Sequence, residues 1–488
     1  LVHYSLVAGE RALAGYAHED ATFHFQRGLA TRDGQSMDAQ TAALLYGLGR
    51  SQAATLDSHR VGEAVGNLSR AFDYYVEIGE LDRAVAIAEN PLSAPFGHRT
   101  GMAQIISRAL VLVPADSHTA GRLLSHYVRV IGSEEGDDNA AQEALGRALA
   151  IAQREGDVAL EMRTLSSACS LDFLHLRLEE CLVKALRAIE LAPRVDAPQA
   201  EVAARYYAAQ SLTSMGDLEE ARRQATAALA PAERLRDRWL GLALAINGLL
   251  SIIEGDFEAA RDFSERSLAV TPPDSFLLFV RTALEFYSGG LDDGAVYLER
   301  LLEAMRLEPG STLECAMVAK LLPEIALITG VTNLLEVAET AAETVLSSPS
   351  AGLLFIMVSR AGLAMVAVQR GDALVAEEQR VALESQPAAI LMPTVCDRLL
   401  GLLSHTMGNL DQAAVHFEDA LAFCRKAGYR PELAWSCCDY ADLLRERDGP
   451  GDREKAVTLL DESLAVSSEL GMRPLMERVL SRREILKA

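Results

Sequence analysis

Few residues in this sequence have the types and spacing that catalysis needs. The adjacent carboxylates Glu134-Glu135 could act as an acid and a base, as could the similar pair at 179–180. The adjacent thiols Cys437-Cys438 could do redox chemistry. Both patterns have ordinary explanations, because acidic pairs on helices are usually solvated or favoured by the positive end of the helix dipole. Cysteines in an apolar helix are usually buried. We therefore expect no catalytic residue.

Metal and cofactor motifs are also missing. His405 and His416 lie on either side of a turn, and Cys424 follows eight residues later, but these three do not have the converging spacing of metal ligands. The stretch 47–50 (GLGR) lacks the third glycine and the preceding strand of a dinucleotide-binding loop. No nucleotide-binding P-loop and no HExxH or GxSxG motif occurs. We predict a non-enzymatic chain with no cofactor and no metal, and rank last an enzyme with an unrecognised site between repeats.

Charge and cysteine usage narrow the partners and the compartment. The 488 residues carry 46 basic and 69 acidic side chains, a net charge of −23. Such a surface repels phosphate backbones and anionic lipids, so direct contact with nucleic acid or a membrane is not expected. The seven cysteines form no CxxC motif, which favours the reducing cytoplasm. No signal peptide opens the chain, and because it begins at Leu1 rather than Met, we expect it to be part of a longer protein.

A turn followed by small residues at fixed spacing recurs along the chain. Gly408 is followed by Ala413, Phe417 and Ala420, which gives G-x4-A-x3-F-x2-A. Glycine permits the left-handed conformation that ends one helix, and the +4 and +3 steps place small residues on one face of the next helix. Two antiparallel helices can then approach closely. The marker glycines of this pattern are at 216, 255, 290, 330, 371 and 408, spaced by 39, 35, 40, 41 and 37 residues.

These intervals are longer and less regular than the 34 residues of a tetratricopeptide repeat. They still predict an all-α fold, a right-handed superhelical solenoid of tetratricopeptide-like helix pairs. Residues 1–90 are expected to form the first repeats and residues 102–488 one continuous array. The segment between Asn90 and Gly101, with two prolines, two glycines and no helical period, is the predicted break.

In a superhelix of this type the first helix of each pair lines the concave side, where partners bind. Alignment on the marker glycines places seven polar or aromatic residues on that side. Arginine and tyrosine are good binding anchors because they combine contact area with directed hydrogen bonds. For any single one of these residues, an ordinary surface position is the favoured alternative, since hot spots are a minority even in real interfaces. The candidate binding residues are Arg163, Tyr206, Gln210, Lys320, Glu324, Arg398 and His405.

Two groups of sequence stretches, one near each end of the chain, have a familiar pattern. Near the start these are 48–56 (LGRSQAATL), 68–75 (LSRAFDYY) and 83–86 (RAVA). Near the end they are 414–420 (AVHFEDA), 427–434 (AGYRPELA), 440–444 (YADLL), 449–453 (GPGDR) and 470–475 (LGMRPL). These stretches resemble the C-terminal repeat arms of large bacterial signal-transduction ATPases. The similar families include LuxR-type transcriptional regulators, the maltose-regulon activator among them, and proteins fused to nucleotide cyclase domains.

This resemblance implies an arm that binds an inducer or a protein partner and relays the event to an ATPase domain upstream in the parent protein. The ATPase, a helix-turn-helix and a cyclase domain are all missing from this sequence, so ATP hydrolysis and DNA binding are expected only of that parent. The alternative is a free-standing scaffold that joins other proteins, since helical-repeat folds serve many functions.

Overall fold

The chain is almost entirely helical in the computed structural model, which describes residues 1–15, 17–34, 36–56, 60–90, 100–235, 237–271, 274–384 and 394–487. No β-strand occurs in these ranges. The helices of the first half are α1 (Val2–Ala14), α2 (His18–Ala30), α3 (Ala39–Thr55), α4 (Val61–Glu77), α5 (Leu81–Ala88), α6 (Met102–Val111), α7 (His118–Val130), α8 (Asp138–Glu155), α9 (Val158–Leu174), α10 (Leu178–Leu191), α11 (Pro198–Met215), α12 (Leu218–Ala227) and α13 (Leu229–Leu235). Those of the second half are α14 (Arg238–Glu254), α15 (Phe257–Val270), α16 (Ser275–Ser288), α17 (Leu291–Leu307), α18 (Thr312–Thr329), α19 (Leu334–Leu346), α20 (Leu353–Arg370), α21 (Ala373–Leu383), α22 (Cys396–Thr406), α23 (Leu410–Ala427), α24 (Arg430–Arg447), α25 (Asp452–Leu470) and α26 (Arg473–Lys487).

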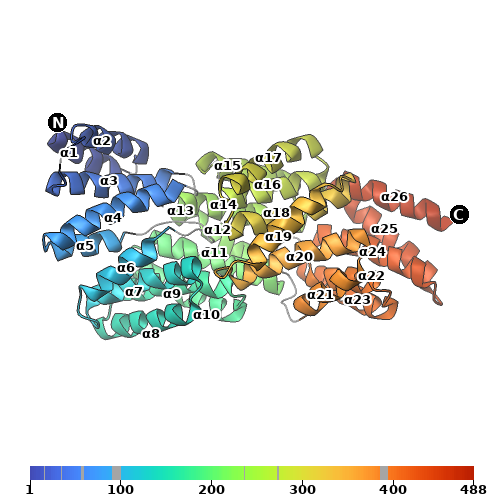
Figure 1. Ribbon diagram of the computed structural model, residues 1–488. Coiled ribbons are helices and arrows are strands. Elements are labelled where there is room, and N and C mark those ends of the chain that lie inside the picture. The colour runs from blue at the N-terminus through green and yellow to red at the C-terminus, as the bar shows by residue number, and fades with distance from the viewer. Residues whose placement is uncertain are drawn as a thin grey trace. The chain divides into compact units, whose positions relative to one another are not determined.

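Within each unit, neighbouring helices pack against each other in antiparallel pairs (Figure 1). Each helix packs on the next from α1 to α8 and again from α15 to α26, as α3 does on α4 and α24 on α25. The first helices of successive pairs also touch, as in the series α16, α18, α20, α22, α24 and α26. Helix pairs that stack on their neighbours in this way define a repeat solenoid. The predicted all-α solenoid of helix pairs is therefore confirmed.

Glycines end the first helix of many pairs. Five of the six marker glycines have a positive φ, for example Gly216 at 85° and Gly408 at 78°. The sixth is placed one residue too late in the sequence analysis, because Gly289 (φ 87°) takes the left-handed conformation while Gly290 does not. Aspartates begin the following helices in several repeats, as the Asp256 carboxylate accepts the backbone N–H of Ala259. This cap satisfies an amide that has no partner within the helix.

The described chain forms two compact units, each with its own core. The first unit holds residues 1–172, 183–207 and 228–240, and the second holds residues 173–182, 208–227 and the rest from residue 241 onward. The predicted break at 90–101 falls mostly outside the described residues, because residues 91–99 are not among them. The boundary at that segment stays a prediction.

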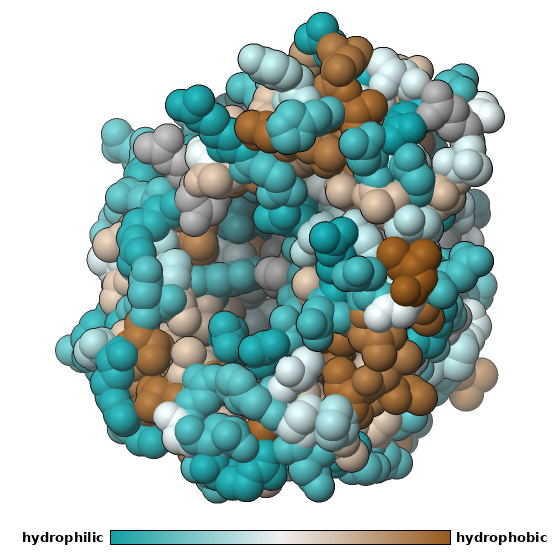
Figure 2. Space-filling view, turned by 90° about the vertical axis from the view of Figure 1, so that its left-hand side faces the viewer, coloured by the Kyte–Doolittle hydropathy of each residue, from teal (hydrophilic) through white to brown (hydrophobic). Residues whose placement is uncertain are grey.

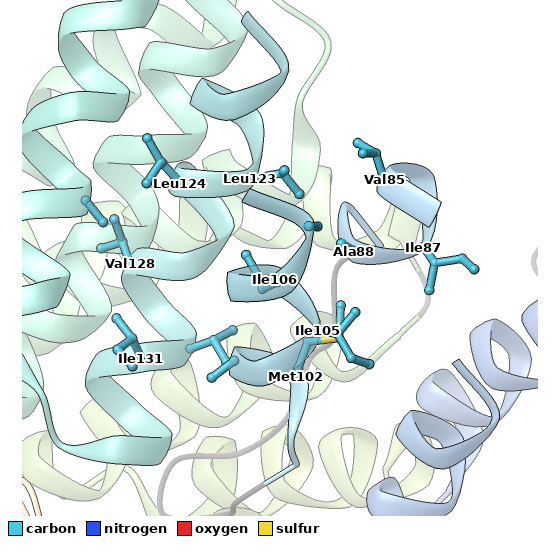
Figure 3. Packing of buried hydrophobic residues seen from close by; sticks show 14 of the residues in the cluster. Val85, Ile87, Ala88, Met102, Ile105, Ile106, Leu123, Leu124, Val128 and Ile131 are labelled. Carbon is cyan, nitrogen blue, oxygen red and sulfur yellow. The ribbon is translucent and has the colours of Figure 1, made fainter. Parts of the chain in front are cut away.

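Aliphatic side chains fill the core of the first unit. Figure 3 shows Ile87 and Ala88 of α5, Ile106 of α6 and Leu124 of α7 in one buried cluster. The cluster extends from α3 to α9 and includes Phe72, whose side chain has no exposed surface. Such a core holds the repeats together by removing apolar surface from water, a stabilisation that depends on area rather than on direction.

In the second unit, α18 and α20 cross at very short range. A Cβ added at Gly362 of α20 would lie 2.1 Å from the carbonyl oxygen of Ala319 in α18, so only glycine fits at this crossing. Among the described residues α20 is also the one helix long and apolar enough to cross a membrane. Most of its apolar stretch is buried within the protein, as expected for a core helix of a repeat array.

Figure 2 views the molecule from the side on which α1 to α8 lie in Figure 1. Hydrophilic residues cover most of this face, and hydrophobic residues form separate patches among them. The exposed apolar side chains of the first unit include Tyr4, Phe23 and Val111. Isolated apolar side chains are normal on protein surfaces, so they do not mark a binding site by themselves.

Candidate functional site

The most unusual feature of the second unit is a set of buried charged side chains on its inner helices. We call this set the inner charge network, and its members come from α18, α22, α24 and α26. Helices α16 and α18 around it are buried on all sides, with every residue from Ser275 to Tyr287 and from Thr312 to Ala326 shielded from solvent. The members of the inner charge network are the buried Lys320, Glu324, Arg398, Glu432 and Asp439, together with Arg478, whose side chain is 22% exposed.

At the α18 end of the network a lysine and a glutamate pair across one helical turn. Lys320 is completely buried, and its ammonium forms an ion pair with Glu324, four residues later on the same helix face. The Lys320 ammonium also donates to Thr394 Oγ1 at 2.9 Å, and the Thr394 hydroxyl donates to Glu324 Oε1 at 2.8 Å. This closed set satisfies the lysine and the glutamate together and ties α18 to the residue that precedes α22.

Arg398 of α22 connects two carboxylates of α24. Its Nη1 donates to Glu432 Oε2 at 3.0 Å and its Nε donates to Asp439 Oδ2 at 2.9 Å. Glu432 also accepts the backbone N–H of Val395 at 2.9 Å. Because guanidinium is planar and always charged, it suits a buried position between two acids.

Asp439 of α24 also connects the network to α26. Arg478 donates to Asp439 Oδ1 at 3.2 Å, and its guanidinium lies over the ring of Trp435 with 5.7 Å between the guanidinium carbon and the ring centroid. The guanidinium of Arg398 also lies over this ring, at 5.4 Å. The indole is thus in contact with both arginines, and cation–π attraction adds to the ion pairs.

The six members carry three positive and three negative charges when all are ionised, so the network is balanced. Burial raises the pKa of Glu432 to about 7, and the positive charge of Arg398 opposes this rise. Buried charges are tolerated in proteins when each is paired and hydrogen-bonded. The arrangement therefore couples the positions of α22, α24 and α26, since moving one of these helices would leave a charge without its partner.

The sequence analysis placed three members of this network among the candidate binding residues. The structure brings Lys320, Glu324 and Arg398 together in the second unit, and all three are buried. Neither interpretation of the sequence, binding anchor or ordinary surface residue, included an internal charge network. Their role in binding a partner stays a prediction.

The other four candidates lie elsewhere. Arg163 is exposed on α9, and Tyr206 is buried on α11 with its ring 6.4 Å from that of Trp239. Gln210 is buried on the same helix as Tyr206. His405 Nε2 lies 2.8 Å from Glu446 Oε2 near the surface. The predicted binding role of these four residues also stays a prediction.

Sequence reasoning missed Thr394, Glu432, Asp439 and Arg478. The signal that could have found three of them is charge complementarity at the repeat spacing. Glu432 and Asp439 follow Arg398 by 34 and 41 residues, close to one repeat, and Arg478 follows Asp439 by 39. Opposite charges at equivalent positions of successive first helices therefore predict ion pairs between them.

No group of three or more histidine, cysteine or acidic residues that could hold a metal lies within the described ranges. All seven cysteines are buried. Burial raises the pKa of Cys315 to about 11 and that of Cys438 to about 12. Because the thiolate is the reactive form, these thiols are poor nucleophiles at neutral pH.

Comparison with known proteins gives fold likeness only. No protein-family model matches the sequence, and no curated protein is significantly similar to it. Among solved structures, the APC/C hetero-tetramer Cut9–Hcn1 matches with a TM-score of 0.42 and 14% identity, over 98% of this chain and 96% of that chain. Yeast Tom70 matches with a TM-score of 0.39 and 15% identity, over 98% of this chain and 99% of that chain. A Rap protein in complex with competence and sporulation factor matches with a TM-score of 0.39 and 11% identity, over 87% of this chain and 98% of that chain.

Proposed function

We propose that this chain works by binding other molecules through its helical repeats and does not itself catalyse a reaction. Helical-repeat arrays present long surfaces on which a partner contacts several repeats at once. The inner charge network supports this proposal, because its charged side chains are paired with one another and are therefore not free to act on a substrate. A protein is the partner class that suits this type of surface.

We further propose that the chain is the sensor arm of a bacterial signal-transduction ATPase that regulates transcription in the cytoplasm. The inner charge network is the observation that carries this step. A sensor must transmit a binding event. Ion pairs join α22, α24 and α26, and hydrogen bonds from Thr394 join the Lys320–Glu324 pair of α18 to the chain just before α22, so a displacement of one of these helices is costly unless its neighbours follow. The inducer or protein partner would bind the repeats, and the ATPase upstream in the parent protein would read the change.

Sequencing the full reading frame around this segment tests the sensor-arm proposal. A P-loop ATPase domain upstream, with a helix-turn-helix at one terminus, is the expected result. A start codon directly before Leu1 and a stop codon directly after Ala488 would overturn it. The chain would then act as a free-standing scaffold that joins other proteins.

A further inference from the structure

Turns far apart in sequence meet within the second unit. The Tyr429 hydroxyl, at the start of α24, donates a buried 2.6 Å hydrogen bond to the backbone oxygen of Thr213 in α11, which is 216 residues away. Next to this bond, a Cβ at Gly216 would lie 2.8 Å from the ring of Phe423 and 3.2 Å from Cβ of Ala427. The turn between α11 and α12 therefore rests on the end of α23 and the start of α24.

The same type of contact recurs one and two repeats later. A Cβ at Gly255, between α14 and α15, would lie 2.6 Å from Leu470 at the end of α25. A Cβ at Gly289, between α16 and α17, would lie 3.2 Å from both Arg473 and Pro474 at the start of α26. We call these three contacts together the seam, and they close the repeats of the second unit on themselves.

Other marker glycines show that this closeness is specific to the seam. Gly330, Gly371 and Gly408 have the same left-handed backbone conformation at the ends of their helices. A Cβ at any of these three positions would meet nothing within 4 Å. Glycine is therefore favoured at Gly216, Gly255 and Gly289 for two reasons. Its backbone adopts the left-handed conformation of the turn, and its lack of a side chain lets a distant turn approach closely.

We propose that the seam is a releasable closure, in which the repeats α22 to α26 separate from the turns of α11 to α17 without unfolding of the rest of the unit. The seam consists of three turn contacts, a short contact of α16 with α26 and one buried long-range hydrogen bond. Tyr429 is its one large side chain that is fully buried, whereas Phe423, Leu470 and Pro474 are partly exposed. By contrast, α16 and α18 behind it are buried along nearly their whole length. Segments with few buried contacts open at lower free energy than the core does.

Release of the seam gives a partner access to inner helices that the closed form keeps from solvent. In this respect the inference rests on the proposed function, since a binding module with buried inner helices needs a way to expose them. The opening itself is a property of the chain alone. It is therefore tested without any partner, and its failure is separate from a failure of the proposed function.

Amide hydrogen exchange followed by mass spectrometry on the full chain tests the closure, with Gly216→Ala as the variant and Gly330→Ala as its matched control. Both substitutions put a side chain at a positive φ, but only the first adds a clash at the seam. We expect Gly216→Ala to speed exchange about tenfold at the remote turn 470–474 as well as near residue 216, with α18 unchanged. Equal exchange in the two variants, or an effect confined to the neighbourhood of residue 216, overturns the proposal.

A crosslink provides the opposite perturbation. In Gly216→Cys with Ala427→Cys, the two Cβ atoms would lie 3.2 Å apart, near the ~3.5–4.5 Å of a disulfide. The oxidised variant is expected to exchange at least about tenfold more slowly than its reduced form at 470–474, and reduction should restore the original rate. An oxidised variant that exchanges like the reduced one at this turn contradicts a common opening.

Discussion

The two units of this protein hold their helices together in different ways. The first packs α3 to α9 around aliphatic and aromatic side chains, and a typical ion pair there, Arg108 with Asp73, is about half exposed. The second joins its inner helices through fully buried pairs such as Arg398 with Glu432. Hydrophobic contact is not directional, whereas a buried ion pair stabilises only one relative position of two helices. The buried pairs of the second unit thus stabilise one relative position of α22, α24 and α26.

The largest difference should appear when one cation is removed from each unit. Arg398→Ala leaves Glu432 and Asp439 buried without their counter-charge, so we expect a loss of about 3–5 kcal/mol in the free energy of unfolding. Arg108→Ala removes a solvent-screened pair and should cost about 1 kcal/mol. Urea denaturation followed by circular dichroism measures both. Similar losses for the two variants would mean that the inner charge network contributes no more than a surface pair.

Removing both charges of the Lys320–Glu324 pair should destabilise the protein less than removing only one of them. Lys320→Met leaves Glu324 as a buried acid without its ammonium and should cost about 3 kcal/mol. Adding Glu324→Met removes the unpaired charge, so the double variant should be more stable than the single one. Thermal unfolding of the two proteins decides the order, and a double variant less stable than Lys320→Met would contradict the pairing.

Glycine-to-alanine substitutions should change stability in opposite directions in the two units. Gly362→Ala puts a Cβ 2.1 Å from the Ala319 oxygen at the α18–α20 crossing, which should cost at least about 2 kcal/mol. Gly66 lies on α4 of the first unit with nothing within 4 Å, so Gly66→Ala should stabilise that helix by about 0.5–1 kcal/mol. Chemical denaturation gives both values. A stabilising Gly362→Ala would show that the two helices are not in close contact.

The smallest effect is a pH dependence specific to the network. The pKa of Glu432 in the folded chain is about 7, above the ordinary value of 4.5, so the folded state binds the proton more tightly than the unfolded state. Its contribution to stability is complete below about pH 4.5 and is lost as the pH rises through about 7. Between pH 5 and pH 8 the native chain should lose more stability than Glu432→Gln does. Parallel pH dependences of the two urea midpoints would contradict the raised pKa.

The helix pairs and their close packing could be predicted from the sequence. Glycine and small-residue spacing predicted helix pairs, and the short distance between Gly401 and the Phe417 ring, 3.1 Å from an added Cβ, is the close approach that the pattern implies. The alignment on the marker glycines also named Lys320, Glu324 and Arg398, and all three belong to the inner charge network, while their predicted binding role stays a prediction. The partners of Arg398, which are Glu432 and Asp439, were not predicted, because the repeat period gives equivalent positions and the signs of the charges at those positions were not compared.

The seam could not be predicted for a different physical reason. The contact between Tyr429 and Thr213 depends on small rotations summed over many repeats, and no local pattern encodes that sum. The left-handed glycines look alike in the sequence, yet Gly216 touches Phe423 while Gly408 faces open space. Only the assembled unit distinguishes them.

Purification of the tagged native protein from its source cells, followed by cross-linking and mass spectrometry, tests the binding function most directly. The account predicts a protein that co-purifies in fixed proportion, cross-links to these repeats and binds again when both components are mixed in pure form. A chain that purifies alone and turns over a substrate would contradict it.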